Sequence, residues 1–173
     1  EISCSLVGSE MCIRDRNLVI SSPLNELDLR NLMYTGYKEC NGPFVIRYPR
    51  GKGEMADWRN EMHILPIGKG KKLRDGDDIA ILSLGPIGNE VIKAIKEVES
   101  DGISIAHYDM IFLKPMDEEL LHEVGKRFSR VITVENGVIK GGLGSAVLEF
   151  MADNGYAPQV KRCLLYTSPS PRD

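Results

Sequence analysis

Two arginines that follow a short apolar run are the residues best suited to chemistry in this 173-residue chain. Residues 44–46 have the length and the β-branched content of a strand, and Arg47-Tyr48-Pro49-Arg50-Gly51 follows them directly. Ligands of parallel α/β sheets bind beyond the carboxyl ends of the strands. A guanidinium on a proline-stiffened turn there can bind a phosphate or carboxylate through two parallel hydrogen bonds. The pattern predicts an anion site at Arg50 or Arg47, and an ordinary basic loop is the alternative.

Three other groups of residues admit a chemical role but favour a structural one. The Asp-Gly-Asp-Asp run at 75–78 lacks the further spaced carboxylates of a calcium loop and predicts a turn. The glycines of 141–145 could let backbone amides approach a phosphate, but glycine also permits close helix–sheet packing, and we expect packing or a subunit contact here. His63, His107 and His122 have no metal-ligand spacing, and no nucleophile–base pair can be named.

The two ends of the chain share a relation that does not come from folding. Residues 163–168 can be encoded by DNA whose reverse complement, shifted by two bases, encodes residues 11–15. Such inverted repeats resemble the transposon ends used to build sequencing libraries, translated by mistake. We therefore expect residues 1–16 and 163–173 to be non-native flanks and exclude them from the fold prediction.

Composition without these flanks restricts the class of protein. Of four cysteines Cys40 remains, which argues against a disulfide framework or a cysteine metal cluster and favours a reducing cytoplasm. The flanks carry three basic and four acidic residues, so the net charge of −3 becomes −2. This near balance argues against a nucleic-acid or anionic-membrane partner. No apolar run approaches the roughly 20 residues that a membrane span needs.

The pattern of strands and helices predicts an α/β fold in two parts. In the first part, a strand at 18–20, a helix at 24–38 and a strand at 44–46 form a β-α-β piece that ends at Arg50. Residues 51–66 combine glycines with a mixed charge cluster and predict a linker between domains.

The second part, residues 67–162, predicts a mostly parallel, doubly wound sheet with helices on both faces. Asn25 in the first part and Asp117 in the second are expected to cap the helices that follow them. In chain order, the expected elements of the second part are strands 67–73 and 79–84, helix 89–98, strand 103–108, helix 117–128, strand 131–135, helix 144–153 and a strand that begins at 159.

Taken together, the motifs resemble the 1-deoxy-D-xylulose-5-phosphate synthase family, thiamine-diphosphate enzymes of the transketolase group. The run at 47–51 is the most specific motif, because other transketolase-like enzymes differ there. Asn136 departs from the family pattern, since many relatives carry a second carboxylate after Glu135. The other matching motifs are Ser22-Pro23, Tyr34-Thr35-Gly36, Gly42-Pro43, Pro66-Ile67-Gly68-Lys69-Gly70, Phe112-Leu113-Lys114-Pro115-Met116-Asp117 and Gly141-Gly142-Leu143-Gly144-Ser145.

The resemblance implies a domain assignment and a reaction. Residues 17–50 would end a pyrimidine-binding domain, and residues 67–162 would form a truncated transketolase C-terminal domain. The parent enzyme would condense pyruvate with glyceraldehyde 3-phosphate, with loss of carbon dioxide. The product, 1-deoxy-D-xylulose 5-phosphate, is a precursor of isoprenoids, thiamine and pyridoxal phosphate. Arg50 matches the arginine that binds the phosphate of glyceraldehyde 3-phosphate, and Arg47 is the weaker candidate.

The resemblance also implies what this chain lacks. Thiamine diphosphate and Mg²⁺ serve the parent enzyme, which would be a homodimer. The Gly-Asp-Gly…Asn element that binds them and the glutamate that activates the thiamine ring are absent. We therefore expect no catalytic, cofactor-binding or metal-binding residue in the fragment, and no activity. Two alternatives stay open: another transketolase-group enzyme, such as transketolase or a 2-oxoacid dehydrogenase β subunit, or a non-catalytic module that dimerises or binds a small regulator.

Overall fold

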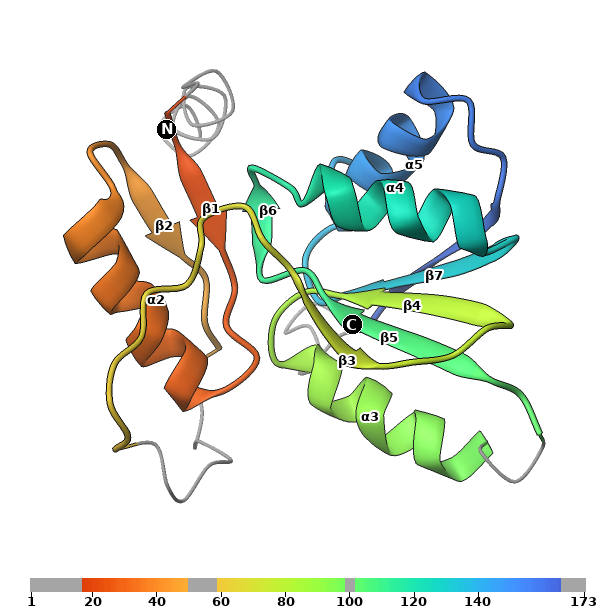
Figure 1. The fold of residues 1–173 in the computed structure, drawn as a ribbon, viewed down its shortest axis with the longest axis horizontal. Helices are drawn as coiled ribbons and strands as arrows, with labels where there is room; N and C mark the ends of the chain where they lie inside the picture. Colours follow the sequence, from red (N-terminus) through yellow and green to blue (C-terminus); the bar gives the residue numbers. More distant parts are fainter. Residues whose placement is uncertain (1–16, 50–58, 99–101, 166–173) are drawn as a thin grey trace, which may run out of the picture.

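The computed structural model describes residues 17–49, 59–98 and 102–165, which form two sheets with their helices. Figure 1 shows a small unit, with the strands β1 and β2 and the helix α2, beside a larger unit with the remaining helices. Within the described residues, no helix is both long and apolar enough to cross a membrane.

The small unit is the predicted β-α-β piece. The strands β1 (Val19–Ser21) and β2 (Phe44–Ile46) are parallel neighbours, and α2 (Glu26–Glu39) connects them. Asn25 caps α2 as predicted, because its side-chain oxygen accepts a hydrogen bond of 2.9 Å from the backbone N–H of Asp28.

A third strand of this small sheet, which the sequence did not predict, comes from the second part of the chain. The strand β6 (Phe112–Lys114) pairs antiparallel with β1, so that Ser21 lies opposite Phe112. Its core brings together Val19, Leu32, Ile111 and Phe112. The two predicted parts therefore share a sheet and are not joined by a linker alone.

The larger sheet has the strand order β3-β5-β4-β7-β8. Neighbouring strands run parallel except β3 and β5, so the prediction of a mostly parallel sheet is confirmed. Its strands are β3 (Lys71–Arg74), β4 (Ile79–Ser83), β5 (Ile105–Asp109), β7 (Arg130–Glu135) and β8 (Gln159–Leu164).

Helices cover both faces of the larger sheet, as predicted (Figure 1). The helix α3 (Ile87–Val98) places Ile87, Val91 and Ile95, which recur every four residues, against one face. The helices α4 (Glu118–Arg127) and α5 (Leu143–Asp153) pack on the other face.

Most element boundaries lie within two residues of the prediction, and two differences have a structural explanation. The strand β3 begins at Lys71 and not at residue 67, because the Gly70 N–H donates to the Asp117 carboxylate at 2.9 Å and not to a neighbouring strand. The strand β8 runs through Leu164, two residues beyond the expected boundary at 162. Cys163 and Leu164 pair with the last residues of β7, and this ladder uses backbone groups that every non-proline residue carries.

The described part of the predicted linker, residues 59–66, forms neither helix nor strand. Two of its backbone N–H groups nevertheless bond to α2. The His63 N–H donates to the Asn31 side chain at 3.0 Å, and the Leu65 N–H donates to the Thr35 hydroxyl at 2.8 Å. This stretch is therefore attached to the small unit.

Candidate functional site

Arg47 lies directly after β2 and is held by three hydrogen bonds. Its backbone N–H donates to the Ser21 carbonyl at 2.8 Å. Its own carbonyl accepts from the Ser22 hydroxyl at 2.9 Å. Its guanidinium Nη2 donates at 2.7 Å to the carbonyl of Asn136, in the loop that follows β7. The guanidinium thus joins the carboxyl end of β2 to the carboxyl end of β7.

Arg50, the residue predicted to bind phosphate, lies outside the described residues, as do residues 51–58. The described part of its motif, residues 47–49, is exposed to solvent. The role of Arg50 therefore stays a prediction, and its local context is known through Arg47.

A cavity of about 350 Å³ lies where the two sheets meet. The small sheet contributes Ile20 and Ser21, and the loop after β7 contributes Gly137 and Val138. Arg47 lines the same cavity. The walls are mostly apolar with a few polar groups, which is the usual character of a small-molecule site.

Glu135 ends β7 in the wall of this cavity and is 6% exposed. Its Oε1 accepts a hydrogen bond of 3.0 Å from the backbone N–H of Gly144, in the first turn of α5. A β-carbon on Gly142 would lie 2.3 Å from Glu135 Oε2 and 2.2 Å from the Val138 carbonyl. Close packing is therefore confirmed for Gly142 and Gly144, whereas a β-carbon on Gly141 would meet no atom within 4 Å. The protein's own carboxylate takes the place that a phosphate would occupy at this helix terminus.

His107 and Asp109 are buried at the carboxyl end of β5, each 1% exposed. His107 Nε2 bonds to the Ser83 hydroxyl at 2.8 Å, and burial lowers the pKa of its imidazole to about 4. Asp109 Oδ1 accepts from the Ile111 N–H at 3.3 Å, and burial raises the pKa of the carboxyl to about 7. His107 is the hydrogen-bonded histidine expected from its position. Asp109 was not singled out, although the alternation of β5 predicts that it shares the face of His107.

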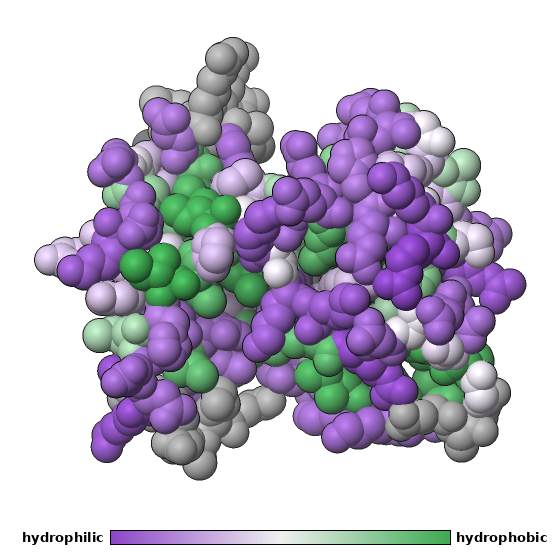
Figure 2. Space-filling view, viewed as in Figure 1, coloured by the Kyte–Doolittle hydropathy of each residue, from purple (hydrophilic) through white to green (hydrophobic). Residues whose placement is uncertain are grey.

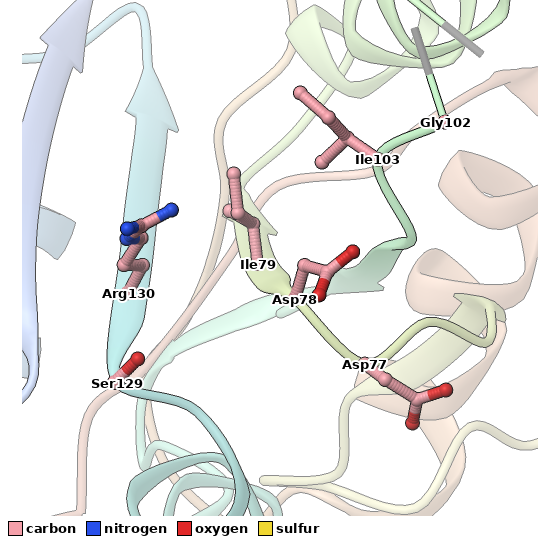
Figure 3. Close-up of a pocket in the computed structure, with 7 residues that line it drawn as sticks. All are labelled: Asp77, Asp78, Ile79, Gly102, Ile103, Ser129 and Arg130. Carbon is pink, nitrogen blue, oxygen red and sulfur yellow. The ribbon is translucent and has the colours of Figure 1, made fainter. Parts of the chain in front are cut away.

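The predicted turn at 75–78 uses its carboxylates in structural contacts. Asp77 pairs with Arg127 at 3.2 Å, and Asp78 accepts from the Ser104 N–H at 2.7 Å. An open pocket of about 380 Å³ lies there, at the amino ends of β4 and β7 (Figure 3). Among the described residues, no three His, Cys, Asp or Glu side chains are grouped so that they could hold a metal ion.

Comparison with known proteins gives a consistent set of relatives. The family described as "Transketolase, C-terminal domain" matches residues 68–173, more than half of the chain. A 1-deoxy-D-xylulose-5-phosphate synthase of Parabacteroides distasonis is 81% identical over 146 residues, which is 84% of this chain and 23% of that protein. The enzyme of the same name from Bacteroides fragilis is 58% identical over 147 residues, with the same shares of the two chains.

A solved structure described as "Split gene transketolase, inactive beta4 tetramer" shares the fold, with a TM-score of 0.76 and 30% identity. The match covers 87% of this chain and 49% of the solved one. This chain thus spans about a quarter of the length of the two synthases and about half of the solved transketolase chain. The matched family covers the whole larger sheet with α3, α4 and α5. The chain belongs to the transketolase C-terminal domain family.

Proposed function

We propose that this chain is part of a 1-deoxy-D-xylulose-5-phosphate synthase, a thiamine-diphosphate-dependent transferase. That enzyme would condense pyruvate with glyceraldehyde 3-phosphate and release carbon dioxide. The observation that carries this proposal is the 81% identity over 146 residues with the Parabacteroides distasonis protein of that name. A transketolase is the less supported candidate, since its solved relative is 30% identical.

Within this reaction we assign Arg50 to the phosphate of glyceraldehyde 3-phosphate. Arginine keeps its charge at every physiological pH and presents paired donors that match a phosphate. Its neighbour Arg47 lies at the carboxyl ends of strands and lines the cavity where the two sheets meet, which supports a ligand site in this region. The phosphate is remote from the reacting aldehyde, so binding energy gained there would position the aldehyde for attack.

Thiamine diphosphate and Mg²⁺ belong to the proposal as cofactors of the parent enzyme. The described residues do not provide a set of metal ligands, so we assign no step of the reaction to these cofactors in this chain. We expect that other parts of the parent protein bind both cofactors. Titration of thiamine diphosphate with Mg²⁺ against the isolated chain should give no measurable binding, and tight binding would contradict this assignment.

Figure 2 shows apolar side chains on the surface of the small unit. Among its exposed apolar residues are Met33 and Val45, which are 62% and 42% exposed. Such exposure suits a unit that is completed by a longer protein or a second subunit, and we propose a homodimer for the parent enzyme. We propose a cytoplasmic location, which suits the free thiol of Cys40.

Steady-state kinetics of the full-length enzyme test the role of Arg50. Arg50→Ala should raise the KM for glyceraldehyde 3-phosphate about 10- to 100-fold, as expected for charged hydrogen bonds to a phosphate, and leave the KM for pyruvate within twofold. Lys38→Ala, which removes an exposed cation at the end of α2, is the control. Equal effects of Arg50→Ala on both substrates would contradict the assignment. A preference for sugar-phosphate donors over pyruvate would favour the transketolase alternative.

A further inference from the structure

Arg47 is fixed at its backbone and at its side chain, which is unusual for an exposed residue at the start of a loop. The bonds of its N–H to Ser21 and of its carbonyl to Ser22 fix both adjoining peptide groups. The bond of its guanidinium to the Asn136 carbonyl reaches across to the other sheet, 89 positions later in the chain. The direction in which the chain leaves β2 toward Pro49 is therefore set by both sheets.

Ser22 connects Arg47 to residues that follow the strands β4 and β5 of the larger sheet. It is 3% exposed, its N–H donates to the Ile111 carbonyl at 2.8 Å, and its hydroxyl donates to Arg47. A β-carbon on Gly85, which follows β4, would lie 2.3 Å from the Ser22 hydroxyl oxygen. Glycine suits this position for two reasons: it has no β-carbon to collide with Ser22, and it readily adopts the observed φ of +82°. The Ser22 hydroxyl is thus held between the end of β4 and Arg47.

Asn136 is equally well anchored. The preceding carboxylate of Glu135 is bonded to the first turn of α5. A β-carbon on Gly137 would lie 2.9 Å from Glu135 Oε2 and 3.6 Å from Arg47 Nη1, so Gly137 separates the carboxylate from the guanidinium. The Asn136 carbonyl therefore presents to Arg47 an acceptor whose two neighbouring residues are closely packed.

We propose that Arg47 and Ser22 are positioning residues that align the segment after β2 for binding of the substrate phosphate. This inference rests on the proposed function, because the segment that they align leads to Arg50. The contacts fix the backbone at Arg47 before the ligand arrives, so less conformational freedom is lost there on binding and affinity for the phosphate gains from them. Neither residue needs to touch the substrate.

The test uses the full-length enzyme with the variants Ser22→Ala, Arg47→Met and Arg47→Lys. Ser22→Ala and Arg47→Met should each raise the KM for glyceraldehyde 3-phosphate by about 3- to 10-fold, the effect of one lost hydrogen bond, with the KM for pyruvate within twofold. Arg47→Lys keeps a donor for the Asn136 carbonyl and should recover part of the loss. Amide hydrogen exchange of residues 47–49 should become faster in Arg47→Met.

Matched controls and the Arg50 variant separate the possible outcomes. Arg130→Met and Ser129→Ala make the same changes at exposed positions at the amino end of β7, and should leave both KM values unchanged. If Arg50→Ala raises the KM for glyceraldehyde 3-phosphate but Ser22→Ala and Arg47→Met do not, the positioning role is wrong and the phosphate site stands. If Arg50→Ala has no such effect, the proposed function itself fails. Equal increases in both KM values for Arg47→Met would show a merely structural role and overturn the inference.

Discussion

The carboxylate of Glu135 accepts a hydrogen bond of 3.0 Å from the backbone N–H of Gly144, so the residue that ends β7 also caps α5. The helix needs this external cap, because its N-cap residue is Gly142 and its first turn has no acidic side chain. A carboxylate at this position satisfies an otherwise unpaired N–H and interacts favourably with the helix dipole. One side chain thus connects the sheet, the helix and the Asn136 loop.

Replacement of Glu135 should destabilise the protein through α5. Glu135→Ala should lower the free energy of unfolding by about 1–3 kcal/mol, because it leaves a buried N–H without an acceptor. Glu135→Gln keeps an acceptor at the same distance and should cost less than half as much. Urea denaturation measures both values. An Ala variant within 0.5 kcal/mol of the wild type, roughly the effect of an ordinary surface substitution, would show that the cap contributes little.

The glycines before α5 provide a second prediction, with a matched pair of variants. Gly142→Ala places a β-carbon 2.2 Å from the Val138 carbonyl and should cost about 2–4 kcal/mol, because backbone must move. Gly141→Ala meets open space, but its φ is +77°, so about 1–2 kcal/mol of backbone strain is expected. Thermal or urea unfolding of both variants shows which substitution costs more stability. A greater loss for Gly141→Ala would mean that backbone conformation, and not packing, selects glycine in this turn.

Features that depend on a few neighbouring residues were predictable from the sequence. The cap at Asn25 involves a residue three positions away, and the predicted helix 89–98 contains Val91 and Ile95, which α3 buries on one face. Fold class and most elements could therefore be read from local patterns.

Features that depend on distant pairing were not predictable. The strand β6 has three residues and exists through its pairing with β1, more than 90 positions earlier in the chain. The bond between Arg47 and Asn136 and the burial of Asp109 likewise arise where the two sheets meet. The motif around Arg50 was found through its resemblance to a family, and no spacing rule distinguishes it from a basic loop.

Asp117 and Asn25 both cap helices, but their side chains accept different numbers of hydrogen bonds. Asp117 accepts from the Leu120 N–H at 3.1 Å and also from the Gly70 N–H at 2.9 Å, whereas the Asn25 side chain accepts from the Asp28 N–H alone among the bonds described. Asp117→Ala should therefore cost about 2–3 kcal/mol of unfolding free energy, and Asn25→Ala about 1 kcal/mol. Chemical denaturation of both variants under the same conditions measures the two losses of unfolding free energy. Equal losses would mean that the bond to Gly70 contributes nothing to stability.

Asp109 and His107 should give opposite pH dependences of stability. The pKa of Asp109 rises from 3.8 to about 7 on folding, so the folded state binds more protons between these values and stability falls as pH rises from about 4 to 7. The pKa of His107 falls from 6.5 to about 4, so the unfolded state binds more protons and stability rises over about pH 4 to 6.5. In the wild type the two effects largely cancel below pH 6.5.

Single substitutions should expose each effect. Asp109→Asn removes the falling contribution, so its unfolding free energy should rise with pH by up to about 3 kcal/mol between pH 4 and 6.5 relative to the wild-type profile. His107→Gln removes the rising contribution, and its profile should fall over the same range. Urea denaturation at half-unit pH steps measures both slopes, with Asp153→Asn, at the exposed end of α5, as a control that leaves the profile unchanged. Parallel profiles for Asp109→Asn and the wild type would show that Asp109 titrates alike in the folded and unfolded states, and that its burial does not raise its pKa.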